Sequence, residues 1–99
     1  MSIVNPFGTY YKVVPASTTG QILGSKGGTG ETLVSMVASV TNATNSQVTI
    51  ADGTTTFNVI PANTPVGTYT VIVNARSTTA PWKVTTASGV SVLCTGDFQ

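Results

Sequence analysis

Hydrophobic and polar residues alternate with a period of two along much of the chain, which predicts β-strands and not helices. The clearest run is 32–40, where one alternating set is apolar and the other is mixed. The apolar set is Val34, Met36, Ala38 and Val40, and the mixed set is Leu33, Ser35, Val37 and Ser39. We therefore expect a half-buried strand that turns the apolar set toward a core.

A second run, 68–75, has the same pattern. One of its faces carries Tyr69, Val71, Val73 and Ala75, and the other carries Thr70, Ile72 and Asn74. Shorter candidate strands lie at 10–14, 21–23, 48–50, 57–60, 82–84 and 90–94. β-Branched residues dominate these runs, as is typical of strands.

Residues that are typical of turns lie between the predicted strands. Asp52-Gly53 predicts a hairpin with Asp52 as a turn residue, 61–67 and 77–81 are connections, and a turn at 87–89 precedes the last strand. Such spacing predicts one small all-β domain, a β-sandwich of about seven strands with an immunoglobulin-like or a jelly-roll-like topology. We assign residues 10–99 to this sandwich.

Residues 1–9 differ from the rest. Ile3, Val4 and Phe7 are apolar, whereas Asn5-Pro6 and Gly8 interrupt regular structure. Two interpretations stay open: a first edge strand that frays at its end, or an N-terminal arm that packs on a neighbouring subunit.

Charge is scarce in this protein. Charged residues make up 7% of the 99 residues, against about 25% in a typical soluble domain. Serine, threonine, asparagine and glycine supply the polarity instead, and hydroxyls and amides cost less to dehydrate than charges do. The net charge of +1 adds little self-repulsion. This composition favours a protein that works inside an assembly, although a neutral extracellular domain has the same composition.

Several classes of partner are disfavoured. The four basic residues are scattered, so we expect no nucleic-acid partner. Apolar runs such as 71–73 are too short to span a bilayer, and the first residues lack the pattern of a secretory signal, so we expect no membrane partner. Cys94 is the single cysteine. We expect it to be a small buried hydrophobic residue in a protein made in a reducing cytosol.

No catalytic constellation emerges, and we expect no enzyme and no catalytic, cofactor or metal site. The chain has no histidine, and we expect Glu31, Asp52 and Asp97 to be solvated turn or terminal residues. The glycine-rich segment 24–30 departs from the phosphate-binding pattern, because Lys26 precedes most of its glycines and a strand follows. This loop is expected to be exposed, or to become ordered on contact with a partner.

The single tryptophan, Trp82, has two interpretations. It is a core residue whose indole N–H bonds a backbone carbonyl, or it is a platform on which a sugar stacks. Tyr10, Tyr11 and Tyr69 would extend such a platform, although Tyr69 is predicted to point inward.

The carboxy-terminal stretch PWKVTTASGVSVLCTGDF, residues 81–98, resembles the endings of small tailed-phage structural proteins. In these, a Trp-Lys start leads through Val-Thr-Thr to a glycine turn and a short closing strand. The hairpin at 52–54 and the strand start at 67–69 fit the same likeness, which covers about residues 48–98. The resemblance implies a virion component, most similar to a capsid decoration (cement) protein, made in the host cytoplasm and carried on the capsid surface.

We therefore expect a non-enzymatic virion protein that binds the major capsid protein or other virion subunits, stabilises the assembled capsid and forms a homo-oligomer, either a dimer or a trimer. A phage tail or neck protein, or a receptor- or carbohydrate-binding β-sandwich domain, is the alternative. The residues expected to contact a partner are Ile3, Val4, Phe7, Tyr10, Tyr11 and Lys26.

Overall fold

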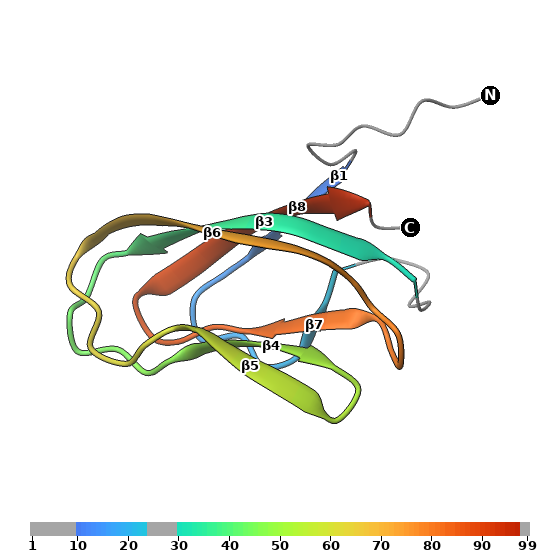
Figure 1. The fold of residues 1–99 in the computed structure, drawn as a ribbon. Coiled ribbons are helices and arrows are strands. Elements are labelled where there is room, and N and C mark those ends of the chain that lie inside the picture. Colours follow the sequence, from blue (N-terminus) through green and yellow to red (C-terminus); the bar gives the residue numbers. More distant parts are fainter. Residues whose placement is uncertain (1–9, 24–29, 98–99) are drawn as a thin grey trace.

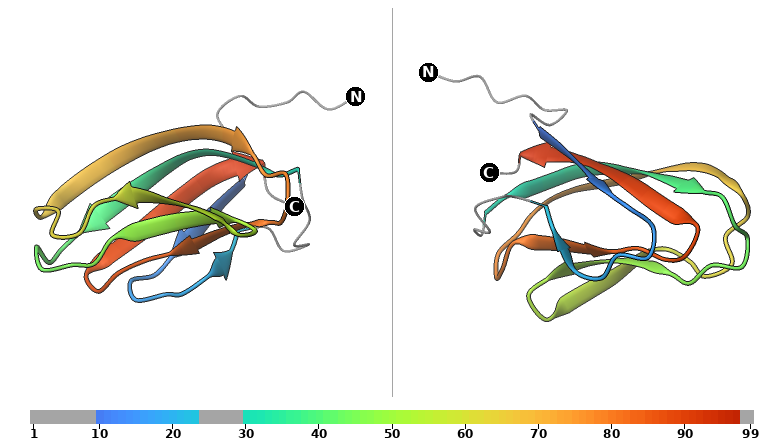
Figure 2. Two further views of the ribbon diagram at one scale, coloured as in Figure 1. Left: turned by 60° about the horizontal axis from the view of Figure 1, so that its bottom comes forward. Right: turned by 180° about the vertical axis from the view of Figure 1, so that it is seen from behind.

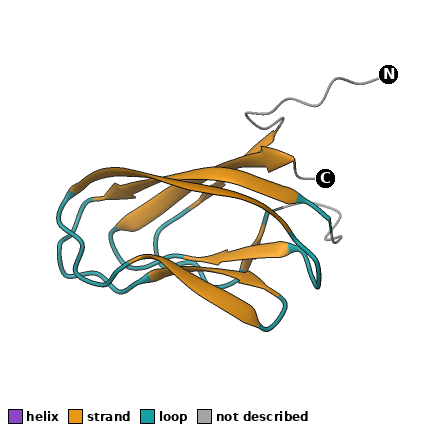
Figure 3. Cartoon of the chain, viewed as in Figure 1, coloured by secondary structure: helices purple, strands orange, loops and turns teal. Residues whose placement is uncertain are grey.

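The structure is a computed structural model, and it describes residues 10–23 and 30–97. Within these residues the chain forms strands and loops and no helix (Figure 3). The strands are β1 (Tyr10–Val14), β2 (Gln21–Ile22), β3 (Thr32–Val40), β4 (Val48–Asp52), β5 (Thr55–Ile60), β6 (Gly67–Arg76), β7 (Trp82–Thr85) and β8 (Val90–Asp97). The predicted all-β sandwich is confirmed, with eight strands where about seven were expected.

The strands form two antiparallel four-stranded sheets that pack face to face (Figure 1). Sheet A has the order β1-β8-β3-β6 and sheet B the order β2-β7-β4-β5. The chain therefore pairs as one nested hairpin, β1 with β8, β2 with β7, β3 with β6 and β4 with β5. This nesting is the jelly-roll arrangement. An immunoglobulin-like sandwich would instead pair its first strand with its second.

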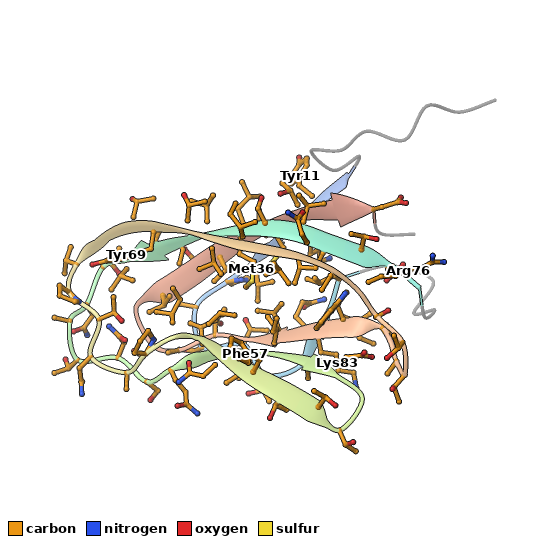
Figure 4. All side chains as sticks on the ribbon, in the orientation of Figure 1. Tyr11, Met36, Phe57, Tyr69, Arg76 and Lys83 are labelled. Carbon is orange, nitrogen blue, oxygen red and sulfur yellow. The ribbon has the colours of Figure 1, made fainter. Side chains whose placement is uncertain are left out.

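The core lies between the sheets and comes from one alternating set of each long strand. Strand β8 contributes alternate residues, Val90, Val92 and Cys94, as the sequence predicted. Met36 of the neighbouring strand β3 lies beside Cys94 on the same inner face, between the two layers in Figure 4. Each fully buried aliphatic side chain stabilises the fold by roughly 1.5–3 kcal/mol. The other core residues are Val14, Leu23, Leu33, Ala38, Val40, Val48, Ile50, Ile60, Trp82, Val84 and Ala87.

Trp82 is confirmed as a core residue. It is 8% exposed, and its indole Nε1–H donates to the carbonyl of Ala75 over 3.2 Å. A tryptophan in this position offers no face to a sugar. Tyr69 also points inward as predicted, and its hydroxyl donates to the carbonyl of Pro65 over 2.8 Å.

The face prediction for the first part of β3 is wrong. Leu33 is fully buried, whereas Val34 is half-buried. The cause is an irregularity in the register between Leu33 and Ser35, where β3 holds one residue more than β8. Such a bulge shifts the alternation by one residue, so Leu33 takes the inner position that strict alternation would give to Val34. From Met36 to Val40 the predicted faces are correct.

The predicted hairpin forms one residue later than expected. Asp52 is the last residue of β4 and pairs with Thr55, so the loop is Gly53-Thr54. Gly53 has a φ of 65° and Thr54 has no positive φ. A positive φ at the first central residue alone is the pattern of a type II′ turn, which glycine favours at that position.

Candidate binding surface

The outer side of sheet A is the strongest candidate for a binding surface. We define the sheet A face by its outward residues, which form three rows across the four strands. One row is Val13, Leu93, Val37 and Thr70, the second is Tyr11, Thr95, Ser35 and Ile72, and the third is Ser91, Ser39 and Thr68. These rows follow from the register, because directly opposed residues in antiparallel strands share a face.

Large hydrophobic side chains stand exposed in the first two rows. Tyr11 is 72% exposed, Ile72 66%, Val13 52% and Leu93 37%. Tyr11 lies outside the upper layer in Figure 4, whereas Met36 lies between the layers. Isolated exposed hydrophobic residues are ordinary on protein surfaces, whereas adjoining ones indicate an interaction site. Here Val13 and Leu93 are direct cross-strand neighbours.

Two polar residues in the second row of the sheet A face, Ser35 and Thr95, bond one another. Ser35 Oγ and Thr95 Oγ1 lie 2.7 Å apart, and Thr95 Oγ1 donates to the carbonyl of Ser35 over 3.3 Å. A hydroxyl that keeps its hydrogen bond loses little when water is removed from above it. This central pair of hydroxyls therefore costs little to dehydrate against a partner.

None of the three rows contains a charged residue. Of the charged residues of sheet A, Lys12 lies opposite Cys94 and so alternates to the other side of β1, whereas Arg76 and Asp97 flank Thr32 at one end of the strands. The outer side of sheet B differs, because its central row runs Ile22, Lys83, Ala51 and Thr56. Lys83 is exposed in the middle of that row. Burial of this ammonium group against an apolar partner would be costly, so the sheet A face is the better docking surface.

Of the residues predicted to contact a partner, Tyr11 is placed on the sheet A face. The backbone of Tyr10 begins β1, but its side chain is outside the described part, as are Ile3, Val4, Phe7 and Lys26. Sequence reasoning missed Val13, Leu93 and Ile72. The sequence could have indicated Ile72, because it is a hydrophobic residue among the otherwise polar, outward positions of the strand predicted at 68–75.

The acidic residues correct a second expectation. Asp97 is exposed, but Glu31 is 4% and Asp52 9% exposed, so these two are not solvated. The Asp52 carboxylate accepts hydrogen bonds from the loop between β6 and β7, and the backbone N–H of Thr78 is the largest cause that lowers its pKa to about 2. Asp52 therefore organises a loop.

Cys94 is confirmed as a buried hydrophobic residue. It is fully buried in β8, and desolvation raises the pKa of its thiol to about 12. A thiol in this state is a poor nucleophile. Within residues 10–23 and 30–97, no three His, Cys, Asp or Glu side chains lie together in a group that could hold a metal ion.

The same residues include no helix that is long and apolar enough to cross a membrane. Comparison with known proteins finds no matching family model, no matching curated protein and no matching solved structure.

Proposed function

We propose that this protein is a non-enzymatic virion component that binds an assembled phage capsid through its sheet A face and stabilises it. The single observation that carries the proposal is an uncharged sheet face on which Tyr11, Val13, Leu93 and Ile72 are exposed. The resemblance of residues 48–98 to small tailed-phage structural proteins supports the same function. Residues 1–9 and Lys26 remain predicted contacts.

Stabilisation would follow from mass action. A module that binds the assembled shell and not its separate subunits shifts the equilibrium toward the shell. Many copies on one particle would add their modest individual affinities. The jelly roll occurs in viral capsid proteins and also in lectins and cupins, so the fold by itself does not select this function.

The test mixes the purified protein with bare capsids assembled from the major capsid protein of the same genome. We expect the protein to co-sediment with these capsids and to raise their heat resistance. Absence of co-sedimentation would overturn the proposal.

Two matched variants identify the face that binds. Leu93→Lys places a charge on the sheet A face, and Ile22→Lys places one on the outer side of sheet B; the two native residues are 37% and 38% exposed. We expect Leu93→Lys to weaken capsid binding by about tenfold or more, because an unpaired charge is costly to bury at an interface. Ile22→Lys should bind like the native protein, and circular dichroism checks that both variants fold.

A carbohydrate-binding function has less support, because the burial of Trp82 removes its expected stacking platform. Tyr11 is the exposed aromatic residue on the sheet A face that such a function would use. A loss of capsid binding together with a glycan-dependent change in tyrosine fluorescence would favour this alternative.

A further inference from the structure

One side of the sandwich is left open. Strand β6 is the last strand of sheet A and β5 the last of sheet B. The two lie on the near side of Figure 1, whereas β1 and β2 are on the near side when the molecule is seen from behind (Figure 2, right). Because both strands are at sheet edges, no other strand among residues 10–23 and 30–97 pairs with their outer backbone groups.

Apolar residues that face inward are uncovered at this side. Phe57 of β5 lies opposite Ile50, which is 4% exposed in the core, so the two side chains share the inner face. Phe57 is nevertheless 67% exposed. On β6, Val71 and Val73 also face the core but are only partly buried. The sheets therefore do not seal their inner faces along the edge formed by β5 and β6.

Residues 67–72 of strand β6 also lack the usual protection of an edge. Sheet edges commonly carry lysine, proline or a bulge that prevents pairing with another chain. Residues 67–73 contain no proline and no charge, and Arg76 stands at the far end of the strand. The irregularity between β3 and β6 lies between Ile72 and Ala75, where Asn74 has a φ of 48°, so Val73 is the one residue of this stretch within it. Residues 67–72 thus offer a regular, uncharged edge, and Val73 ends the stretch.

We propose that this edge pairs with the β6 edge of a second copy of the chain, in antiparallel orientation about a two-fold axis at Thr70. The pairing would join both A sheets into one continuous sheet. The same axis would bring the two β5 edges together, so that each Phe57 is covered by the other copy. This is an isologous interface, in which one surface meets itself.

The side chains of β6 suit such self-pairing. With Thr70 opposite itself, Tyr69 lies opposite Val71 on the inner face and Thr68 lies opposite Ile72 on the outer face. Aromatic–β-branched and Thr–Thr pairs are favourable across strands. Arg76 falls beyond the paired stretch and never meets its own copy. The chain's net charge of +1 adds little repulsion between the two copies.

The size of the interface sets the expected affinity. Seven paired residues span about 23 Å. Two sheets that lie about 10 Å apart, together with their side chains, form an edge about 20 Å thick. The contact area is therefore roughly 450 Å² per copy. Stable interfaces bury at least about 1,000 Å² in total, so this one is at the weak limit. We expect a dissociation constant in the micromolar range, which binding to a multivalent capsid would reinforce.

The experiment measures self-association without any capsid, so its failure is separate from failure of the proposed function. Sedimentation equilibrium of the native 10.1 kDa chain should show a concentration-dependent dimer. Thr70→Lys opposes two like charges at the axis and should weaken dimerisation at least tenfold. The matched control, Thr19→Lys, changes an exposed threonine between β1 and β2 and should dimerise like the native chain.

A second variant tests the geometry directly. Thr70→Cys should cross-link rapidly to its copy with a short bismaleimide, whereas Thr19→Cys should not. The native Cys94 is buried and should not react with the cross-linker in either variant. A native chain that stays monomeric at hundreds of micromolar would overturn the proposal. So would a dimer that tolerates Thr70→Lys and fails to cross-link through position 70, since it would use another surface.

Discussion

At the scale of single residues, Asp52 has the most structural consequence. Its Oδ2 accepts from the Thr78 backbone N–H over 2.9 Å and from the Thr78 hydroxyl over 3.0 Å. Its Oδ1 accepts from the backbone N–H groups of Thr79 and Ala80, each over 2.9 Å. One carboxylate therefore fixes the loop between β6 and β7 to the end of β4. A charged acceptor with several backbone donors is stronger than a neutral one.

These bonds predict a pH dependence of stability. Backbone hydrogen bonds from Thr78, Ala80 and Thr79 lower the pKa of Asp52 from 3.8 to about 2 in the folded protein. A depressed carboxyl pKa contributes stability above pH 3.8, and this contribution is lost as the pH falls toward 2. We expect the melting temperature of the native protein to fall over this interval.

Asp52→Asn is the matched variant, because the amide has the same shape and does not titrate. It should melt at a lower temperature than the native protein at pH 7, since an NH₂ group would face backbone donors. The difference between the two proteins should shrink as the pH falls from 4 to 2. A difference that stays constant with pH would contradict the role of the Asp52 charge.

At the scale of elements, glycines decide how tightly the loops approach one another. Gly89, before β8, has a φ of 77°, and a Cβ added there would lie 2.6 Å from Asn42 Cβ. Its carbonyl accepts hydrogen bonds from the backbone N–H and the hydroxyl of Thr41, over 2.8 and 3.1 Å. The turn after β7 thus packs closely on the segment that follows β3. Gly20 has a similar φ of 64° but open space around it.

Alanine substitutions at these two glycines distinguish the effect of backbone strain on stability from the effect of close packing. Gly20→Ala should lower the free energy of unfolding by about 1–2 kcal/mol, because alanine is strained at positive φ. Gly89→Ala should lower it by about 2–4 kcal/mol, since overpacking against Asn42 adds to that strain. Urea denaturation measures both values. Equal losses would show that the contact with Asn42 is relieved without cost.

At the scale of the whole molecule, the nested topology makes most strand pairs distant in sequence. Among the strands of the described part of the chain, only β4 and β5 are joined by a tight hairpin. The outermost pair, β1 with β8, brings Tyr10 opposite Gly96. Closing such long loops costs entropy before the contacts form. The same topology aligns β1, β8, β3 and β6 side by side, which assembles the sheet A face from residues 11–95.

Folding should therefore be slow for a chain of this size. We expect the main phase after dilution from urea to take milliseconds to seconds, as in other domains dominated by long-range strand pairing. Trp82 is the single tryptophan and moves from solvent to the core, so stopped-flow fluorescence reports the reaction directly. A main phase in microseconds would mean that local structure governs folding.

Parts of this architecture were predictable from local patterns. The alternation at 68–75 identified Tyr69 and Val71 as inward residues. In β8, the hydrophobic residues at every second position from Val90 to Cys94 identified the set that is buried. Alternation failed at Val34, because the bulge there depends on how β3 meets β8 and is not encoded in β3 alone. The burial of Asp52 was missed for the same reason, since its donors lie 26 to 28 residues away.

The all-β class, the placement of the strands and the scarcity of charge follow from the order of the amino acids, because strand periodicity, turn residues and composition are local properties of the chain. The jelly-roll order, the shared face of Tyr11, Val13, Leu93 and Ile72, and the uncovered edge at Phe57 arise only when the strands pack together. These features depend on which distant strands become neighbours. Pairing partners are selected by the free energy of the whole packed sandwich, which a local pattern does not contain.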